Sequence, residues 1–127
     1  AWDIAGTGCF FGSGNRNASL LGASYENRPT DTALIPIDTL ARELEPDYIK
    51  FDTEGAEQQG LIGAAATIDR ARPKLRVAAY HRTEDLIALP KLLLSLCPDY
   101  HIYLRRKRCL PAWEADFIAL PEKGAIT

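Results

Sequence analysis

Residues 48–57 read YIKFDTEGAE, and this stretch decides the fold. Its first four residues predict a short strand, which runs directly into Asp52-Thr53-Glu54-Gly55. A helical pattern begins after the glycine. Glycine permits a tight turn between two elements, so Gly55 would place the carboxylates of Asp52 and Glu54 at the end of the strand. The stretch therefore predicts a strand–turn–helix unit whose turn carries polar side chains.

The next segment predicts a helix followed by a second strand. Gly60 and Gly63 lower helix propensity by up to about 1 kcal/mol each, and small residues there would let the helix lie close to a sheet. Pro73 ends this single long helix. Residues 75–80 form a nearly continuous apolar run, which is typical of a strand covered on both faces. Apolar residues recur at helical spacing at Leu61, Ile62, Ala65, Ile68 and Ala71.

Further along, the pattern alternates again. Thr83 predicts the cap of another helix, which Pro90 would break in two. Residues 100–104 predict a strand, 105–112 a loop, and 114–120 a last strand that pairs antiparallel with the one before. The order from residue 48 onward predicts an α/β fold, a partial Rossmann-like sheet that is mostly parallel with a final antiparallel strand. Right-handed crossovers would place helices on both faces.

Upstream of residue 48 the signals are weaker. A short strand is predicted at residues 9–11 and an extended segment at 33–37. Asp38 predicts the cap of a short helix that ends near Pro46. Residues 12–29 are rich in turn formers and predict a loop.

The composition describes an ordinary globular chain. The 127 residues carry a net charge of −2, and 46% of them are apolar. This balance is typical of one domain, residues 1–127, and argues against disorder. No apolar run reaches the roughly 18 residues of a membrane helix, and near-neutral charge gives no general attraction to nucleic acid or anionic membrane. We therefore expect neither a nucleic-acid partner nor a membrane partner.

Cysteine and methionine usage bears on compartment and completeness. The widely spaced Cys9, Cys97 and Cys109 argue against a disulfide framework or a zinc site, so we expect reduced thiols and a cytoplasmic location. Cys97 lies in an apolar run, which predicts core packing. There is no methionine, even at position 1, which indicates a processed or excised piece.

The residues that carry chemistry follow the two predicted strands. In open α/β sheets, ligands bind beyond the carboxyl ends of strands, where Asp52, Glu54 and His81 fall. If the strands are neighbours, about 5 Å apart, the three side chains share one crevice. Such a set can take a proton from a hydroxyl group or hold a metal. Capping is the alternative for Glu54, and a structural hydrogen bond to the backbone is the alternative for His81.

Other polar residues have structural interpretations. Glu57 lies in the first helical turn, where capping is expected. His101 starts a strand at the opposite edge of the sheet and is expected to be structural. Residues 6–11 and 12–17 open like dinucleotide-binding motifs but lack the third glycine. The basic run 105–108 predicts solvated loop charge, with an anionic substrate group as the alternative.

Residues 48–57 resemble the I-K-x-D-x-E-G-A-E signature of FkbM-type S-adenosylmethionine-dependent methyltransferases. The similarity extends from Ile35 to Leu120, and Asp38 also falls at a family position. Further matching positions are Leu61-Ile62-Gly63-Ala64, Pro73-Lys74-Leu75, Tyr80-His81, Asp85-Leu86 and Leu89-Pro90.

The resemblance implies the C-terminal portion of a class I methyltransferase domain, with the N-terminal cofactor-binding half absent. Asp52, Glu54 and His81 would flank the transferred methyl group and its acceptor, and Asp52 would also contact S-adenosylmethionine. The acceptor would be a small molecule, methylated on a hydroxyl of a sugar or natural-product-type scaffold. No metal site is implied. Most of the cofactor pocket would lie outside this chain, so the isolated chain is expected to be inactive.

Two other functions stay open at this point. Asp52-x-Glu54 also resembles the first motif of metal-dependent proofreading exonucleases, although that motif leads into a second strand and Gly55 precedes a predicted helix. A non-catalytic module is the other alternative. It would form a homo-oligomer through an exposed sheet edge.

Overall fold

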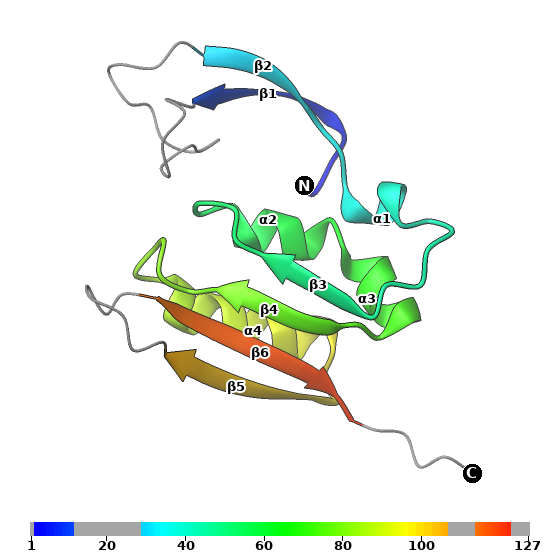
Figure 1. Cartoon of the computed structure of the whole chain (residues 1–127), viewed down its shortest axis with the longest axis vertical. Coiled ribbons are helices and arrows are strands. Elements are labelled where there is room, and N and C mark those ends of the chain that lie inside the picture. The colour runs from blue at the N-terminus through cyan, green and yellow to red at the C-terminus, as the bar shows by residue number, and fades with distance from the viewer. Residues whose placement is uncertain (1, 12–28, 107–113, 123–127) are drawn as a thin grey trace.

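A computed structural model of the chain describes residues 2–11, 29–106 and 114–122. Within them, four strands form the central sheet, which Figure 1 shows from one face. In spatial order the strands are β3 (Tyr48–Phe51), β4 (Lys74–Ala78), β6 (Ala115–Pro121) and β5 (Tyr100–Arg106). The predicted strand at the start of the YIKFDTEGAE stretch is confirmed residue for residue.

The pairing of these strands is mixed. β3 and β4 are neighbours and pair in parallel. This is the arrangement that would bring the polar side chains after the two strands together. β6 pairs antiparallel with both β4 and β5, which confirms the antiparallel final pair. The prediction of a mostly parallel sheet is not confirmed. The last strand enters between β4 and β5, so one reversed strand makes two antiparallel ladders.

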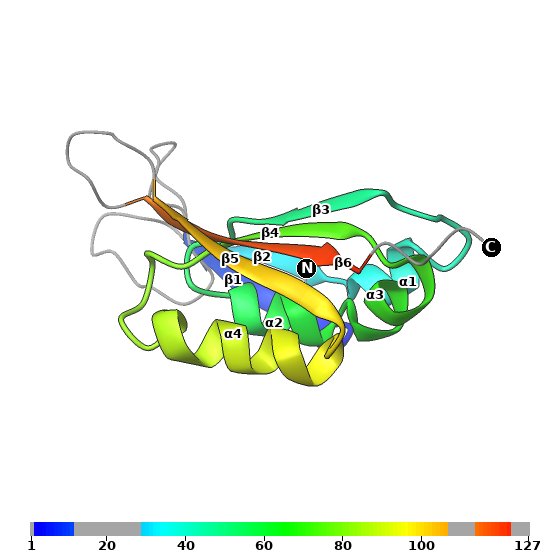
Figure 2. The same cartoon turned by 90° about the horizontal axis from the view of Figure 1, so that it is seen from below.

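The helices of the described residues lie on one face of the sheet. Figure 2 shows α2 (Glu57–Ile62), α3 (Ala65–Ala71) and α4 (Asp85–Leu96) on the same side. The prediction of helices on both faces is not confirmed for these residues. The crossovers from β3 to β4 and from β4 to β5 move in the same direction across the sheet. Two right-handed crossovers in one direction put both sets of helices on one face.

The predicted long helix is two helices, because a partner from another segment stabilises a break. The chain leaves α2 at Gly63, whose carbonyl accepts the Asp38 N–H at 2.8 Å. The Asp38 carboxylate accepts the N–H groups of Ala66 at 3.1 Å and Thr67 at 2.7 Å. Asp38 lies in the first turn of α1 (Ile37–Leu40) but caps α3. The prediction that it caps its own helix is therefore wrong.

The prediction that Pro90 breaks the following helix is also wrong. α4 runs through Pro90 without interruption. Leu89 and Leu93 on either side of the proline are fully buried, and their burial against the sheet holds the helix together. Thr83 is not the cap, because α4 begins after Glu84 and no side chain caps it.

The core lies between the sheet and the three helices. Cys97 packs there, as predicted, and its thiol donates to the Leu93 carbonyl at 3.0 Å. The predicted second strand is confirmed at β4. Its coverage on both faces is not confirmed, because the helices of the described residues lie on one face. Arg76 on β4 pairs with Asp116 at 2.6 Å. The largest apolar members are Phe51, Leu61, Ile68, Leu75, Val77, Leu89, Leu93 and Phe117.

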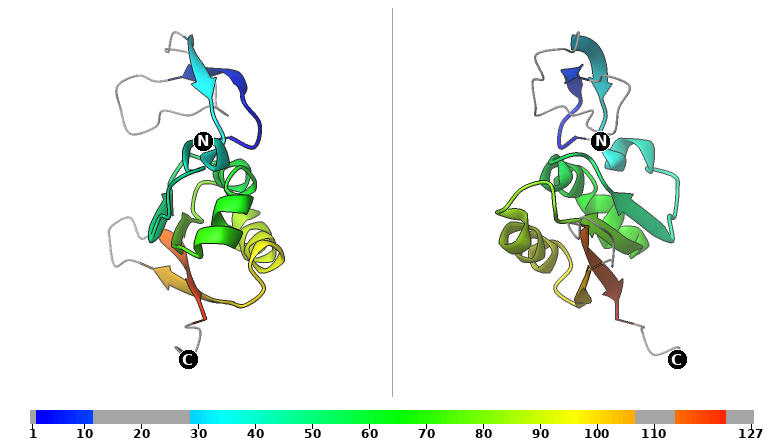
Figure 3. Two further views of the ribbon diagram at one scale, coloured as in Figure 1. Left: turned by 90° about the vertical axis from the view of Figure 1, so that its right-hand side faces the viewer. Right: turned by 60° about the vertical axis from the view of Figure 1, so that its left-hand side comes forward.

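A second, two-stranded sheet stands beyond α1 (Figure 3). β1 (Gly6–Phe11) pairs antiparallel with β2 (Pro29–Leu34). The strand predicted at residues 9–11 is thus confirmed and longer. Of the extended segment predicted at 33–37, Ala33 and Leu34 belong to β2 and Pro36 has an extended backbone, whereas Ile37 begins α1. Arg105 and Arg106 of the predicted loop continue β5.

Some predictions lie outside the described residues, namely the loop between β1 and β2, the end of the basic run and Cys109. In the described part of the chain, no helix has the length and the apolar character that crossing a bilayer requires.

The close approach of α2 to β3 gives a testable prediction. A Cβ on Gly60 would lie 2.9 Å from a ring carbon of buried Phe51. Overpacking costs about 1–3 kcal/mol, against a gain of up to about 1 kcal/mol in helix propensity. We expect Gly60→Ala to lower the free energy of unfolding by about 1 kcal/mol in urea titrations.

The control is Gly6→Ala, where a Cβ meets nothing within 4 Å, so its stability should stay within about 0.5 kcal/mol of wild type. A Gly60→Ala chain as stable as wild type would refute the close packing of α2 on β3.

Candidate functional site

The three predicted side chains come together at the carboxyl ends of β3 and β4. His81 Nε2 lies 3.5 Å from Glu54 Oε2 and 3.7 Å from Asp52 Oδ1. Because β3 and β4 are parallel neighbours, the segments that follow them meet at the same edge of the sheet. The three side chains that the sequence predicted to share one crevice therefore do lie close together. His101 lies near the start of β5, at the opposite edge, as predicted.

The turn after β3 has an unusual backbone. Glu54 has φ 54° and Gly55 has φ 99°. Glycine adopts positive φ readily, whereas a residue with a side chain does so at a cost of about 1 kcal/mol or more. Two successive left-handed residues turn the chain sharply from the strand into α2 and leave the Glu54 carboxylate 3.5 Å from His81. Strained non-glycine residues cluster at functional sites.

Asp52 is held by two donors. Lys50 Nζ donates to its Oδ2 at 2.6 Å and the Tyr80 hydroxyl donates to its Oδ1 at 2.8 Å. Partial burial alone would raise the pKa of Asp52, but these hydrogen bonds and the Lys50 charge outweigh it, so the pKa lies below its ordinary value. Burial and the contact with Asp52 raise the pKa of Tyr80. Asp52 is therefore a stable anion with a phenol that stays protonated beside it.

Glu57 has a role that its position in the sequence did not predict. This carboxyl group is fully buried, and its Oε1 accepts the Thr53 N–H at 2.7 Å. The same oxygen lies 2.8 Å from His81 Nδ1. The expected capping is not seen, because Thr53 lies in the turn before the helix and no side chain caps α2. One feature of the sequence could have indicated that Glu57 is buried. It precedes the core residues Leu61 and Ala64 at helical spacing, which places it on their side of the helix.

A second buried carboxyl group lies at the start of α4. Asp85 is 1% exposed, and its Oδ1 accepts a hydrogen bond from Gln58 Nε2 at 3.2 Å. Burial raises its pKa, while the Gln58 hydrogen bond works against that shift. This hydrogen bond links α2 to α4, and no described hydrogen bond joins Asp85 to His81.

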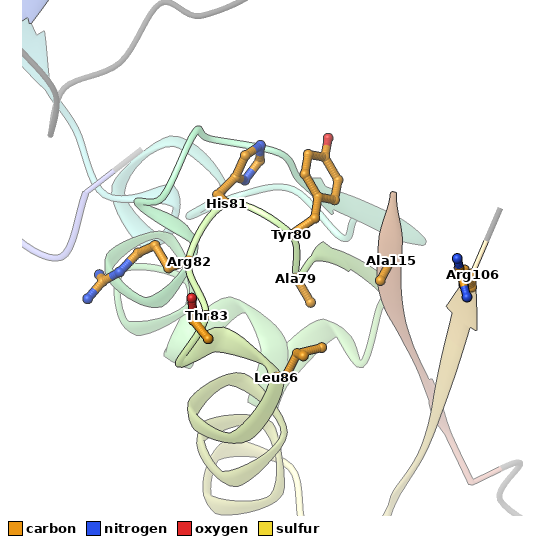
Figure 4. A pocket seen from close by; sticks show the side chains of 8 residues that line it. All are labelled: Ala79, Tyr80, His81, Arg82, Thr83, Leu86, Arg106 and Ala115. Carbon is orange, nitrogen blue, oxygen red and sulfur yellow. The ribbon is translucent and has the colours of Figure 1, made fainter. Parts of the chain in front are cut away.

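An open hollow of about 560 Å³ adjoins the crevice. Figure 4 shows Ala115 and Arg106 across the hollow from Arg82 and Thr83. The Arg82 side chain already has a partner, because its Nε donates to the Glu84 carboxylate at 2.8 Å. Arg106 brings one residue of the predicted basic run to the hollow. The lining residues are Ala79, Tyr80, His81, Arg82, Thr83, Leu86, Arg106 and Ala115.

The described residues include no group of three or more His, Cys, Asp or Glu side chains arranged to hold a metal ion. The chain enters α2 two residues after Gly55. The exonuclease motif would require a second strand at this position, so the strand–turn–helix geometry does not fit that alternative.

The low pKa of Asp52 gives a prediction about acid stability. A carboxyl group with a lowered folded pKa stabilises the protein above its ordinary pKa of 3.8, and the contribution disappears as the pH falls below it. We expect the free energy of unfolding of wild type to fall more steeply between about pH 5 and about pH 2 than that of Asp52→Asn. Urea titrations across this range measure the difference, with Asp69→Asn, at an exposed position of α3, as the control. Parallel curves for wild type and Asp52→Asn would contradict the prediction.

Comparison with known proteins identifies the family. Residues 3–107 match the methyltransferase FkbM domain. The crystal structure of methyltransferase FkbM from Methylobacillus flagellatus KT is similar, with a TM-score of 0.65 and 37% sequence identity. The match covers 70% of this chain and 23% of that one, so the chain spans less than a quarter of its solved relative. A search of curated proteins finds no match. The chain belongs to the FkbM methyltransferase domain family.

Proposed function

We propose that this chain supplies acceptor-side residues of a methyltransferase that transfers a methyl group from S-adenosylmethionine to a hydroxyl group. The observation that carries the proposal is the meeting of Asp52, Glu54 and His81 at the strand ends of an FkbM-family chain. Proton-accepting side chains at that edge suit the loss of a hydroxyl proton during methylation.

The carboxylates of the site fit the proposed methyl donor. S-adenosylmethionine supplies an electrophilic methyl group on a positively charged sulfur. The lowered pKa of Asp52 keeps this carboxylate ionised at neutral pH, and Glu54 lies on the same side of His81. Negative charge beside a sulfonium group favours its binding. Asp52 would thus contact the cofactor while Lys50 and Tyr80 fix its orientation.

The hollow beside the crevice is our proposed acceptor site. Tyr80 and His81 border both the hollow and the crevice, so a small molecule held there would present a hydroxyl group to His81. Its lining is partly apolar, from Ala79, Leu86 and Ala115, which suits the carbon face of a sugar or a natural-product scaffold. Positioning of acceptor and methyl group would supply much of the rate acceleration.

Our proposal for the isolated chain follows from the small share of its solved relative that it spans. It spans 23% of its solved relative, and we propose that most of the cofactor pocket lies outside it. The isolated chain would then be inactive and would bind S-adenosylmethionine weakly or not at all. For the whole protein we propose a cytoplasmic location, with no nucleic-acid or membrane partner.

Self-association stays a second proposal. β3 is the terminal strand of the central sheet, and Tyr48 on it is exposed. A terminal strand offers unpaired backbone groups to another chain. A homo-oligomer formed through this edge would be seen by light scattering, whereas a strictly monomeric chain would argue against it.

A chimera tests the proposed function. The part of this chain that matches the Methylobacillus flagellatus enzyme would replace its counterpart in that enzyme. Transfer of labelled methyl from S-adenosylmethionine to hydroxyl compounds would then be followed. General base catalysis contributes about 10²–10⁴-fold, so we expect His81→Gln in the chimera to lower the turnover rate about 100-fold or more. The isolated chain should show no transfer and no micromolar binding in calorimetry.

The control is His101→Gln, which changes the other histidine, far from the site. It should leave the turnover rate within about twofold of the unmodified chimera. Two results would contradict the proposal: a His81→Gln chimera as active as the control, or micromolar cofactor binding by the isolated chain.

A further inference from the structure

The potential proton acceptors of the site are not equivalent. Both oxygens of Asp52 accept hydrogen bonds, from Lys50 and from Tyr80. A carboxylate that two donors stabilise holds a proton poorly, which makes it a weak base. Asp52 therefore suits a role as a fixed negative charge, and the uptake of a proton falls to another group.

One ring nitrogen of His81 lies within hydrogen-bond distance of a carboxylate oxygen, and the other has no hydrogen-bond partner. Its side chain is 8% exposed, and Nδ1 faces Glu57 Oε1 at 2.8 Å. Nε2 is buried and has no hydrogen-bond partner. Glu54 and Asp52 lie 3.5 Å and 3.7 Å from this atom, beyond ordinary hydrogen-bond distance. A buried polar nitrogen without a partner, next to carboxylates at a strand end, is suited to meet a ligand atom.

Glu57 determines which nitrogen carries the proton. Its Oε1 already accepts the Thr53 N–H at 2.7 Å, so this oxygen acts as an acceptor. The nitrogen that faces it must then be the donor, which places a hydrogen on Nδ1. In the neutral ring, Nε2 is consequently the nitrogen with the free lone pair. Because Glu57 is fully buried on α2, this arrangement is set before any ligand arrives.

We propose that Glu57 is a positioning residue, which holds His81 in the Nδ1-protonated tautomer and makes Nε2 the proton acceptor of the site. This inference rests on the proposed function. In that reaction, a lone pair of the acceptor oxygen forms the new bond to the methyl carbon. The electron pair of the broken methyl–sulfur bond stays on sulfur, and His81 Nε2 takes the hydroxyl proton. The resulting imidazolium keeps its hydrogen bond to Glu57, which stabilises the positive charge.

Nitrogen NMR of the 127-residue chain tests the inference without a cofactor or an acceptor. With ¹⁵N-labelled histidine, the ring shifts and couplings distinguish a protonated from an unprotonated nitrogen. We expect neutral His81 to be protonated at Nδ1 and unprotonated at Nε2. The exposed His101 is an internal control in the same spectrum. A neutral His81 protonated mainly at Nε2 would overturn the inference, whatever the variants show.

Two variants separate positioning from general stability. Glu57→Ala should shift the His81 tautomer toward Nε2 protonation and leave His101 unchanged. Asp85→Asn alters the other buried carboxyl group near α2 and should leave both histidines unchanged. If Glu57→Ala folds and retains the wild-type tautomer, Glu57 does not set it. Failure here would leave the methyl-transfer test of the chimera intact, and failure of the chimera would leave the tautomer result standing.

Discussion

The hydrogen bonds of the Glu57 carboxyl group are the constraint on which the site depends. One buried oxygen on α2 binds the backbone of the turn after β3 and the imidazole of the segment after β4. Burying such a group without partners costs several kcal/mol, so the two bonds hold both segments in place. The parallel pairing brings the strand ends together, but Glu57 decides how the side chains beyond them face one another.

Other contacts of the helices keep α2, and with it Glu57, in position. Gly60 lets α2 lie against Phe51 of β3, and Glu57 lies about one turn before Gly60 on the same helix. Asp38, from a different segment, caps α3 where the helix layer breaks. Both crossovers leave the helices on one face, and the site opens where the strands of the parallel pair end. Local backbone strain at Glu54 is tolerated because these contacts fix the elements on either side of the turn.

The sequence predicted what depends on neighbouring residues and missed what depends on distant ones. The strand at residues 48–51, the turn at Gly55 and the meeting of Asp52, Glu54 and His81 follow from local pattern and strand adjacency. The break at Gly63 could not be predicted, because Asp38 stabilises it from far along the chain. The continuity of α4 through Pro90 could not be predicted either, because it depends on burial of the flanking leucines. The order of strands also escaped prediction, since no local signal places β6 between β4 and β5.

The same distinction explains Glu57. Its position at the start of a helix predicted capping, and only the position of His81 in space shows its other partner. A double-mutant cycle on unfolding, with Glu57→Ala, His81→Ala and the double variant, measures this interaction directly. A hydrogen bond with a charged partner contributes about 1.5–3 kcal/mol, so the two substitutions should couple by about that amount. Effects that add to within about 0.5 kcal/mol would contradict the claim that this contact organises the site.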